Sequence, residues 1–312
     1  MSRRSALIGL GTAMGGLSMP FVVRAQNAAP YTTSRYTYSG HGSVNTHWIE
    51  TPSSVIVIDV QRDTFHAAEA LNAVKAIGKP VSAILVTHGH PDHYTGLEQF
   101  RAQWPGVPIY ASPETIRVVE TDHYGYHQVV RELAPDAAPS EFVVPDRPIE
   151  LNETLAIDGV TIETREMGPS EATSATVFYL PETQELYAGD TVLNQMHGFL
   201  YEERSGEVLD TLQRMRVLFP EAQVIHPGHG DPGAAMALMD AHEDYTETAR
   251  RLVAELMSDA MSAEQIIADV TQSLQLGYPN YQIPGGQPDM IELSVGGVLA
   301  ELTELREIDS SQ

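Results

Sequence analysis

The feature that most constrains this chain is a run of three histidines and one aspartate within six positions, His88, His90, Asp92 and His93. An apolar, strand-like stretch, residues 81–86, leads directly into it. A short loop at the end of a strand can turn all four side chains inward at this spacing, whereas a continuous helix does so poorly. Imidazole nitrogen and carboxylate oxygen are ligands for Zn²⁺ and similar divalent ions. The run therefore predicts a metal site and not a histidine-rich surface loop, because histidine is rare and a strand precedes the run.

Three further motifs follow the same order as in a known family. Asp59 comes directly after residues 54–58, Ser-Val-Ile-Val-Ile. Asp190 ends an Ala-Gly-Asp triplet, and His229 lies in Pro-Gly-His-Gly. Together with the histidine run, they make the chain resemble the metallo-β-lactamase-fold hydrolase superfamily, in particular its glyoxalase II and lactonase branches, over about residues 40–235. The resemblance implies two metal ions. The implied ligands are His88 and His90 for the first ion, Asp92, His93 and His229 for the second, and Asp190 between them.

The chain departs from the family where a further histidine is expected, in the turn before the strand-like residues 175–180. Residues 167–173 contain no histidine, and Glu171 is the only residue among them whose side chain is a strong metal ligand. Three alternatives follow: Glu171 binds the first metal, His197 binds it instead, or the site holds a single ion. Asp59 is expected to orient a ligand imidazole or the loop backbone. If His197 is not a metal ligand, we expect it to line a pocket.

The remaining pattern fits an α+β chain with two β-rich halves, an αββα sandwich. A strand hairpin is expected over residues 44–60, helices over 64–77, 94–103 and 113–133 with a break near Gly125, and short strands over 149–151, 154–157, 160–167, 175–180 and 185–188. A helix over 208–219 and a strand over 224–226 follow, and the pattern is mainly helical from residue 232. We expect residues 26–235 to form the metal-binding domain, with 26–33 flexible, and residues 236–312 to form a helical cap. The Pro/Gly-rich residues 277–288 are either a connector or a wall over the metal site.

The N-terminus is typical of an export signal. Arg3 and Arg4 precede a Gly/Ala/Leu-rich stretch, and Val23-Arg24-Ala25 offers a small-residue cleavage site. The arginine pair resembles a twin-arginine signal. We expect residues 1–25 to be removed and the protein to be periplasmic or secreted, without stable membrane insertion after cleavage. The alternative is an uncleaved anchor, which the glycines after Ile8 disfavour.

The net charge and the amino-acid composition limit which partners and which metals the protein is expected to bind. The formal net charge is −24, which disfavours binding to nucleic acid or to anionic membranes. Because the chain has no cysteine, its metal must be held by histidine and carboxylate, which favours zinc, as one or two ions, or manganese or iron. Oligomeric state is left open.

The predicted chemistry is metal-assisted hydrolysis of a small ester, thioester, lactone or amide, with Asp92 holding the water or shuttling its proton. No Gly-x-Ser-x-Gly motif supports a serine nucleophile. Two alternatives stay open: a β-lactamase in the strict sense, and a non-catalytic metal-binding or substrate-binding protein of an exported pathway.

Overall fold

The computed structural model describes residues 30–150, 152–258 and 261–310, so the predicted export signal lies outside the described residues. The strands of this part form two six-stranded sheets, in the orders β1-β2-β3-β4-β5-β6 and β12-β11-β10-β9-β8-β7. The first sheet comprises β1 (Thr32–Tyr36), β2 (Thr46–Glu50), β3 (Val55–Ile58), β4 (Val81–Leu85), β5 (Ile109–Ala111) and β6 (Arg147–Pro148). The second comprises β7 (Thr154–Ile157), β8 (Val160–Glu166), β9 (Thr176–Leu180), β10 (Glu185–Gly189), β11 (Val224–Pro227) and β12 (Gly233–Ala234).

The helices lie between and after these strands. Those of the first half are α1 (Thr64–Ala76), α2 (Pro91–Tyr94), α3 (Leu97–Gln103), α4 (Pro113–Thr121) and α5 (Tyr126–Leu133). Those of the second half are α6 (Ser205–Leu218), α7 (Ala235–Leu256), α8 (Ala263–Gly277), the 3₁₀ turn η1 (Pro284–Gly286) and α9 (Met290–Ser310). None of the helices in the described ranges combines the length and apolarity that a membrane crossing needs.

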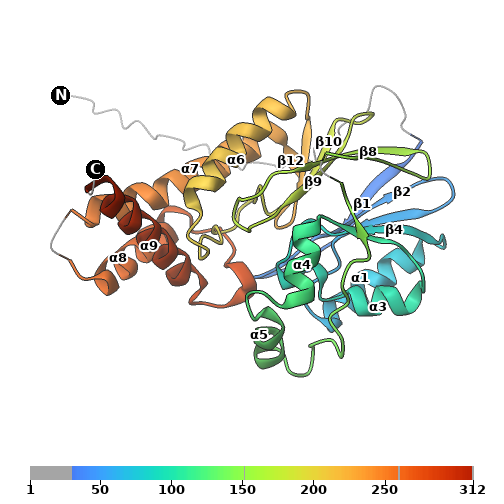
Figure 1. Ribbon diagram of the computed structural model, residues 1–312, viewed down its shortest axis with the longest axis horizontal. Helices are drawn as coiled ribbons and strands as arrows, with labels where there is room; N and C mark the ends of the chain where they lie inside the picture. The colour runs from blue at the N-terminus through green and yellow to red at the C-terminus, as the bar shows by residue number, and fades with distance from the viewer. Residues whose placement is uncertain (1–29, 151, 259–260, 311–312) are drawn as a thin grey trace, which may run out of the picture.

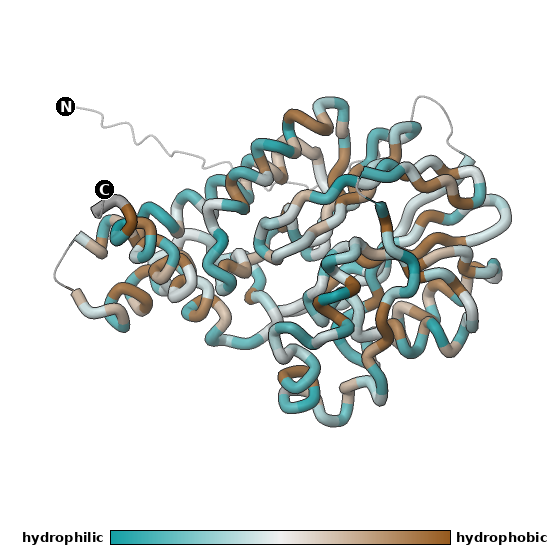
Figure 2. The backbone as a smooth tube through the Cα atoms, in the orientation of Figure 1, coloured by the Kyte–Doolittle hydropathy of each residue, from teal (hydrophilic) through white to brown (hydrophobic). Residues whose placement is uncertain are grey.

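Three apolar clusters hold the layers together. One lies between the two sheets, where Ile56 and Ile58 of β3 meet residues such as Phe178 of β9. The alternate side chains of β3, Val55 and Val57, point outward into a second cluster with α1 and α3. The third cluster joins the second sheet to α6 and α7. Figure 1 shows the sheets between these helices, and Figure 2 shows apolar segments along the strands. The predicted αββα sandwich is confirmed.

Local signals account for several element boundaries. Helix α1 begins where the Asp63 carboxylate accepts the His66 N–H at 2.9 Å, as an N-cap does. The predicted break near Gly125 is confirmed, because α4 ends at Thr121 and Gly125 takes a φ of 72° before α5 begins. The predicted hairpin is also confirmed as the antiparallel pair β2–β3.

Two expectations were wrong in the described part of the chain. Residues 31–33 are not a flexible leader, because Tyr31 is buried in the cluster between the sheets and β1 pairs with β2. This edge strand is half exposed, so it lacks the apolar run that marks a buried strand. The strand expected at 149–151 is β6, Arg147–Pro148; Ile149 follows it and fills the core.

The C-terminal helices form the extension that the sequence predicted, with α8 and α9 packed beside α7 at one end of the molecule (Figure 1). The connection between α8 and α9, residues 278–289, returns toward the first sheet. Its Ile283 carbonyl accepts the Gly42 N–H at 3.0 Å, and its Gln282 side chain accepts the Ser43 hydroxyl at 2.7 Å. Arg62 also donates to the Gly285 carbonyl at 2.6 Å. These contacts fix the connection against residues 42–43.

Candidate metal centre

The histidine run divides between a loop and a short helix. His88 lies in the loop after β4, and His90 is the N-cap of α2 with an extended backbone. Pro91 occupies the first helical position, where its fixed φ favours helix initiation. Asp92 and His93 therefore project from the first turn of α2, while His88 and His90 project from the chain that enters it.

Two side chains of the second sheet meet this run because parallel strands end at the same edge. Asp190 follows β10 and His229 follows β11, and these strands are parallel neighbours. The Gly228 N–H donates to the Gly189 carbonyl at 2.8 Å, which brings the two turns together. The side-chain amide of Asn45 donates to the carbonyls of Pro227 and Gly230 at 2.9 and 2.8 Å and clamps the turn that carries His229.

Glu171 reaches the centre from the connection between β8 and β9. The Glu166 carboxylate organises this connection, accepting the backbone N–H of Gly168 at 3.0 Å and that of Ala175 at 2.8 Å. The Thr176 N–H donates to the Thr87 carbonyl at 2.8 Å, which holds the connection against the histidine run.

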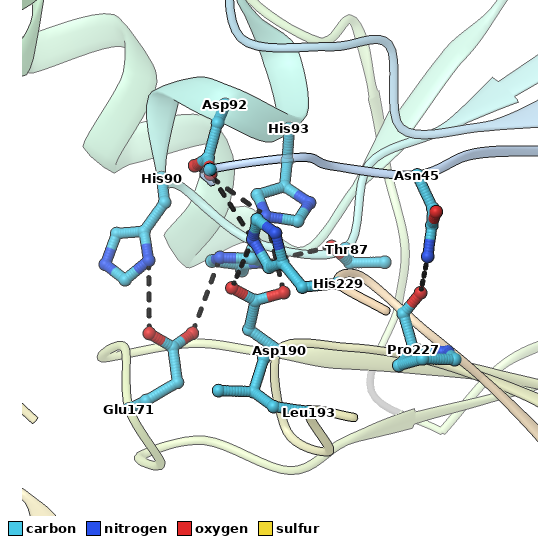
Figure 3. Close-up of polar contacts among 12 residues, drawn as sticks. Asn45, Thr87, His90, Asp92, His93, Glu171, Asp190, Leu193, Pro227 and His229 are labelled. Carbon is cyan, nitrogen blue, oxygen red and sulfur yellow. Dashed lines mark hydrogen bonds and ion pairs between the residues drawn. The ribbon is translucent and has the colours of Figure 1, made fainter. Parts of the chain in front are cut away.

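The predicted ligands lie in two adjoining groups, His88, His90, Glu171 and Asp190, and Asp92, His93 and His229. Within each group the potential ligand atoms all lie within 4.8 Å of one another. Glu171 Oε1 lies 3.4 Å from His88 Nε2, and its Oε2 lies 3.1 Å from His90 Nδ1. Asp190 Oδ1 lies 3.4 Å from His93 Nε2, and its Oδ2 lies 3.2 Å from His229 Nε2. Asp190 is thus close to both groups, as Figure 3 shows.

Each of the four imidazoles has one ring nitrogen turned to the centre and the other held from outside. The outward nitrogens contact Thr87 Oγ1 (His88, 2.9 Å), Glu202 Oε1 (His90, 3.1 Å), Asp59 Oδ2 (His93, 2.8 Å) and the Ser43 carbonyl (His229). These acceptors favour the tautomers that leave a lone pair on each inner nitrogen. Asp59 therefore has the orienting position that the sequence predicted, and it also accepts the Thr87 N–H at 2.9 Å.

The inner atoms fit a divalent metal. His88 Nε2, His93 Nε2, Asp190 Oδ1 and both Glu171 oxygens are buried and have no hydrogen-bond partner in the described part of the chain. Buried polar atoms without partners are costly and are rare in folded proteins. Unpaired lone pairs of imidazole and carboxylate that converge on one place are the donor set of zinc, manganese and iron sites.

The electrostatics of the cluster lead to the same conclusion. Burial alone would raise the pKa of Asp190, but His229 and His93 outweigh it and hold that pKa well below its ordinary value. In the opposite sense, burial would lower the pKa of His229, but Asp190 and Asp92 raise it to about 10. Burial raises the pKa of Glu171 in spite of His90 beside it. The carboxylates therefore need positive charge close by, which divalent ions supply.

The other histidines lie apart from both groups. His197 was the alternative metal ligand that the sequence left open. Its Nδ1 lies 3.1 Å from the Tyr245 hydroxyl, and its ring makes an edge-to-face contact with Tyr281. His226 pairs with Glu185 at 3.1 Å. His47 is buried and contacts the Pro227 carbonyl at 2.9 Å. Sequence reasoning missed Asn45, Glu166 and Glu202, since each acts through another residue and none lies in a recognisable motif.

Comparison with known proteins agrees with this geometry. A model of the metallo-beta-lactamase superfamily matches residues 39–255. A hydroxyacylglutathione hydrolase of Xanthomonas oryzae pv. oryzae is 27% identical over 187 residues, which cover 60% of this chain and 62% of that protein. The chain thus matches less than two thirds of the length of this curated relative.

Solved structures share the fold. A metallo-beta-lactamase family protein from Thermus thermophilus aligns with a TM-score of 0.65 at 20% identity, over 89% of this chain and 94% of that one. A metallo-beta-lactamase from Pontibacter korlensis aligns with a TM-score of 0.53 at 23% identity, over 70% and 94%. The first alignment extends over more of this chain than the second.

Proposed function

Because the chain belongs to the metallo-beta-lactamase superfamily, we propose that it is a metal-dependent hydrolase of a small thioester or ester. The observation that carries the proposal is the set of buried, unpaired ligand atoms from His88, His93, Glu171 and Asp190. Divalent ions in such a site supply a hydroxide nucleophile near neutral pH and polarise the scissile carbonyl. Zinc is the first candidate, and the carboxylate of Glu171 also suits manganese or iron.

We assign the residues to two ions. His88, His90 and Glu171 would hold the first, and Asp92, His93 and His229 would hold the second. Asp190 lies in one group with His88, His90 and Glu171, and its two oxygens also lie 3.4 Å from His93 Nε2 and 3.2 Å from His229 Nε2, so it would lie between the two ions. Glu171 takes the place where the family resemblance implies a histidine. The extra negative charge makes the first site harder and offsets part of the positive charge of the ion.

Asp92 is proposed as the catalytic carboxylate. Its side chain is 21% exposed, compared with 7% or less for His93, Asp190 and His229 beside it, so it is the part of this group open to solvent. Its Oδ2 lies 3.3 Å from His229 Nε2, and its Oδ1 lies 3.7 Å from His93 Nε2. From this position Asp92 holds the attacking water and moves a proton toward the leaving group.

A thioester is the first substrate to test, because relatives matched over more than half of this chain are named hydroxyacylglutathione hydrolase. The β-lactamase alternative has weaker support, because the structures titled metallo-beta-lactamase are less than 25% identical and indicate the fold alone. The non-catalytic alternative predicts metal binding without turnover.

The test uses metal-free protein that is reloaded with zinc and assayed on a thioester, a lactone, an aryl ester and a chromogenic β-lactam. We expect zinc to restore thioester hydrolysis in the wild type and in His226→Ala, whose imidazole lies outside the cluster, but not in His90→Ala. Full zinc loading without turnover of any substrate would favour the binding protein. Preferential turnover of the β-lactam would favour the strict β-lactamase.

We also propose that residues 1–25 direct export and that the mature protein is periplasmic or secreted. The support is the arginine pair, the apolar stretch and the small-residue site at Ala25. Removing three arginines and no acidic residue would change the net charge from −24 to −27. A mature chain of this charge is expected to bind neither nucleic acid nor anionic lipid.

A further inference from the structure

Two of the four imidazoles, those of His90 and His93, have a carboxylate beside each ring nitrogen. His90 lies between two carboxylates, with Glu171 Oε2 3.1 Å from Nδ1 and Glu202 Oε1 3.1 Å from Nε2. Glu202 lies in the segment before α6, 112 positions further along the chain. The outer acceptor of His93 is also a carboxylate, but its inner nitrogen faces Asp190 at 3.4 Å, a longer separation.

Glu202 is itself buried and held in place. Its side chain is 7% exposed, and its Oε1 accepts the Tyr126 hydroxyl of α5 at 2.9 Å. Arg204 Nε lies 3.6 Å from Oε2, which offsets part of the charge. A buried carboxylate therefore faces His90 from a fixed position.

The need for this carboxylate follows from Glu171. A neutral imidazole carries one proton and places it next to the better acceptor. With Glu171 alone beside Nδ1, the proton would sit on Nδ1 and form a hydrogen bond to Glu171 Oε2. In that tautomer a proton takes the place of the Nδ1 lone pair that a metal ion needs. The hydrogen bond also engages Glu171 Oε2, an oxygen of another proposed ligand of the same ion.

We propose that Glu202 is a positioning residue for the first metal site, accepting the Nε2–H of His90 so that the Nδ1 lone pair stays free for the ion. Glu202 thereby compensates for the carboxylate that replaces a histidine at position 171. The inference rests on the proposed function only in requiring that the cluster binds metal. Partners that orient a metal-binding histidine in this way typically change metal affinity by about 10- to 100-fold.

The test is a zinc titration of metal-free protein against a competing chelator, which resolves the two binding equivalents. Glu202→Leu removes the acceptor, and we expect one equivalent to weaken by about 10- to 100-fold while the other keeps its wild-type affinity. Glu202→Gln keeps a carbonyl oxygen at this place, so it should recover most of the lost affinity. The matched control is Glu185→Gln, which alters a carboxylate 3.1 Å from the Nε2 of His226, outside the cluster, and should leave both equivalents unchanged.

A second readout is the ring proton of His90 in zinc-loaded protein, followed by NMR. We expect a slowly exchanging Nε2–H in the wild type and in Glu202→Gln, and its loss in Glu202→Leu. Wild-type affinity for both equivalents in folded Glu202→Leu would overturn the inference and leave the proposed function intact. If Glu202→Leu does not fold, Glu202→Gln carries the test. Loss of the slowly exchanging Nε2–H in Glu202→Gln, or an equal loss of affinity for both zinc equivalents, would overturn the inference. A wild-type protein that binds no zinc would instead refute the proposed function.

Discussion

Gly228 offers a sharp test of the position of Asp190, because a single methyl group at this glycine would point at the carboxylate. Gly228 does not have a left-handed backbone, so alanine is not excluded by its φ. A Cβ built on it would lie 2.1 Å from Asp190 Oδ1 and 2.8 Å from the His93 ring carbon Cε1. Since ordinary contact begins at 3.4 Å, Oδ1 would have to retreat by the difference, 1.3 Å. The Gly228→Ala substitution therefore displaces the proposed shared ligand Asp190, and to a smaller extent the neighbouring ligand His93, without changing the chemistry of either side chain.

We expect Gly228→Ala to fold but to lose about 100-fold in turnover, the typical cost of moving a catalytic group by about 1 Å. Its zinc content should fall below that of the wild type, since Asp190 serves both groups. Gly277→Ala is the matched control, because its added Cβ meets nothing within 4 Å. The assays are thioester hydrolysis at saturating zinc, elemental analysis and a thermal melt. Wild-type zinc content and turnover in a folded Gly228→Ala would refute the reasoning that places Asp190 in the centre.

Three other predictions concern the metal set, the core and the N-terminus. Glu171→Ala should lose one metal equivalent and keep the one held by Asp92, His93, Asp190 and His229; an unchanged metal-to-protein ratio on elemental analysis would make Glu171 a turn residue only. Burial lowers the pKa of His242 to about 4, so the folded state favours its neutral form. As the pH falls from about 6.5 to about 4, the wild type should therefore lose roughly 3 kcal/mol of unfolding free energy relative to His242→Met in urea melts at fixed zinc; parallel curves would contradict this. Mass spectrometry of extracytoplasmic protein should show residues 1–25 missing, whereas an intact Met1 would indicate an uncleaved anchor.

The sequence predicted most of the centre because its ligands lie in short motifs at the ends of strands. The histidine run follows β4, Asp190 follows β10 and His229 follows β11. In such places a few neighbouring residues determine where a side chain points. Glu171 was one of three open possibilities, and the structure brings it, and not His197, into the cluster.

The residues that hold the ligands were not predicted, because they are distant in sequence. Glu202 meets His90 across 112 positions, and Asn45 meets Pro227 across 182. A single glutamate or asparagine in a loop has no periodicity or motif to distinguish it from a solvated side chain. Strand β1 was missed for a related reason, since an edge strand pairs through its backbone and needs no apolar pattern.

The most direct test of the metal assignment is a crystal of zinc-loaded protein measured on both sides of the zinc absorption edge. We expect two anomalous peaks, one among His88, His90 and Glu171 and one among Asp92, His93 and His229, with Asp190 between them. Absence of any peak in this cluster, or a peak held by His197 in place of Glu171, would contradict the proposed centre.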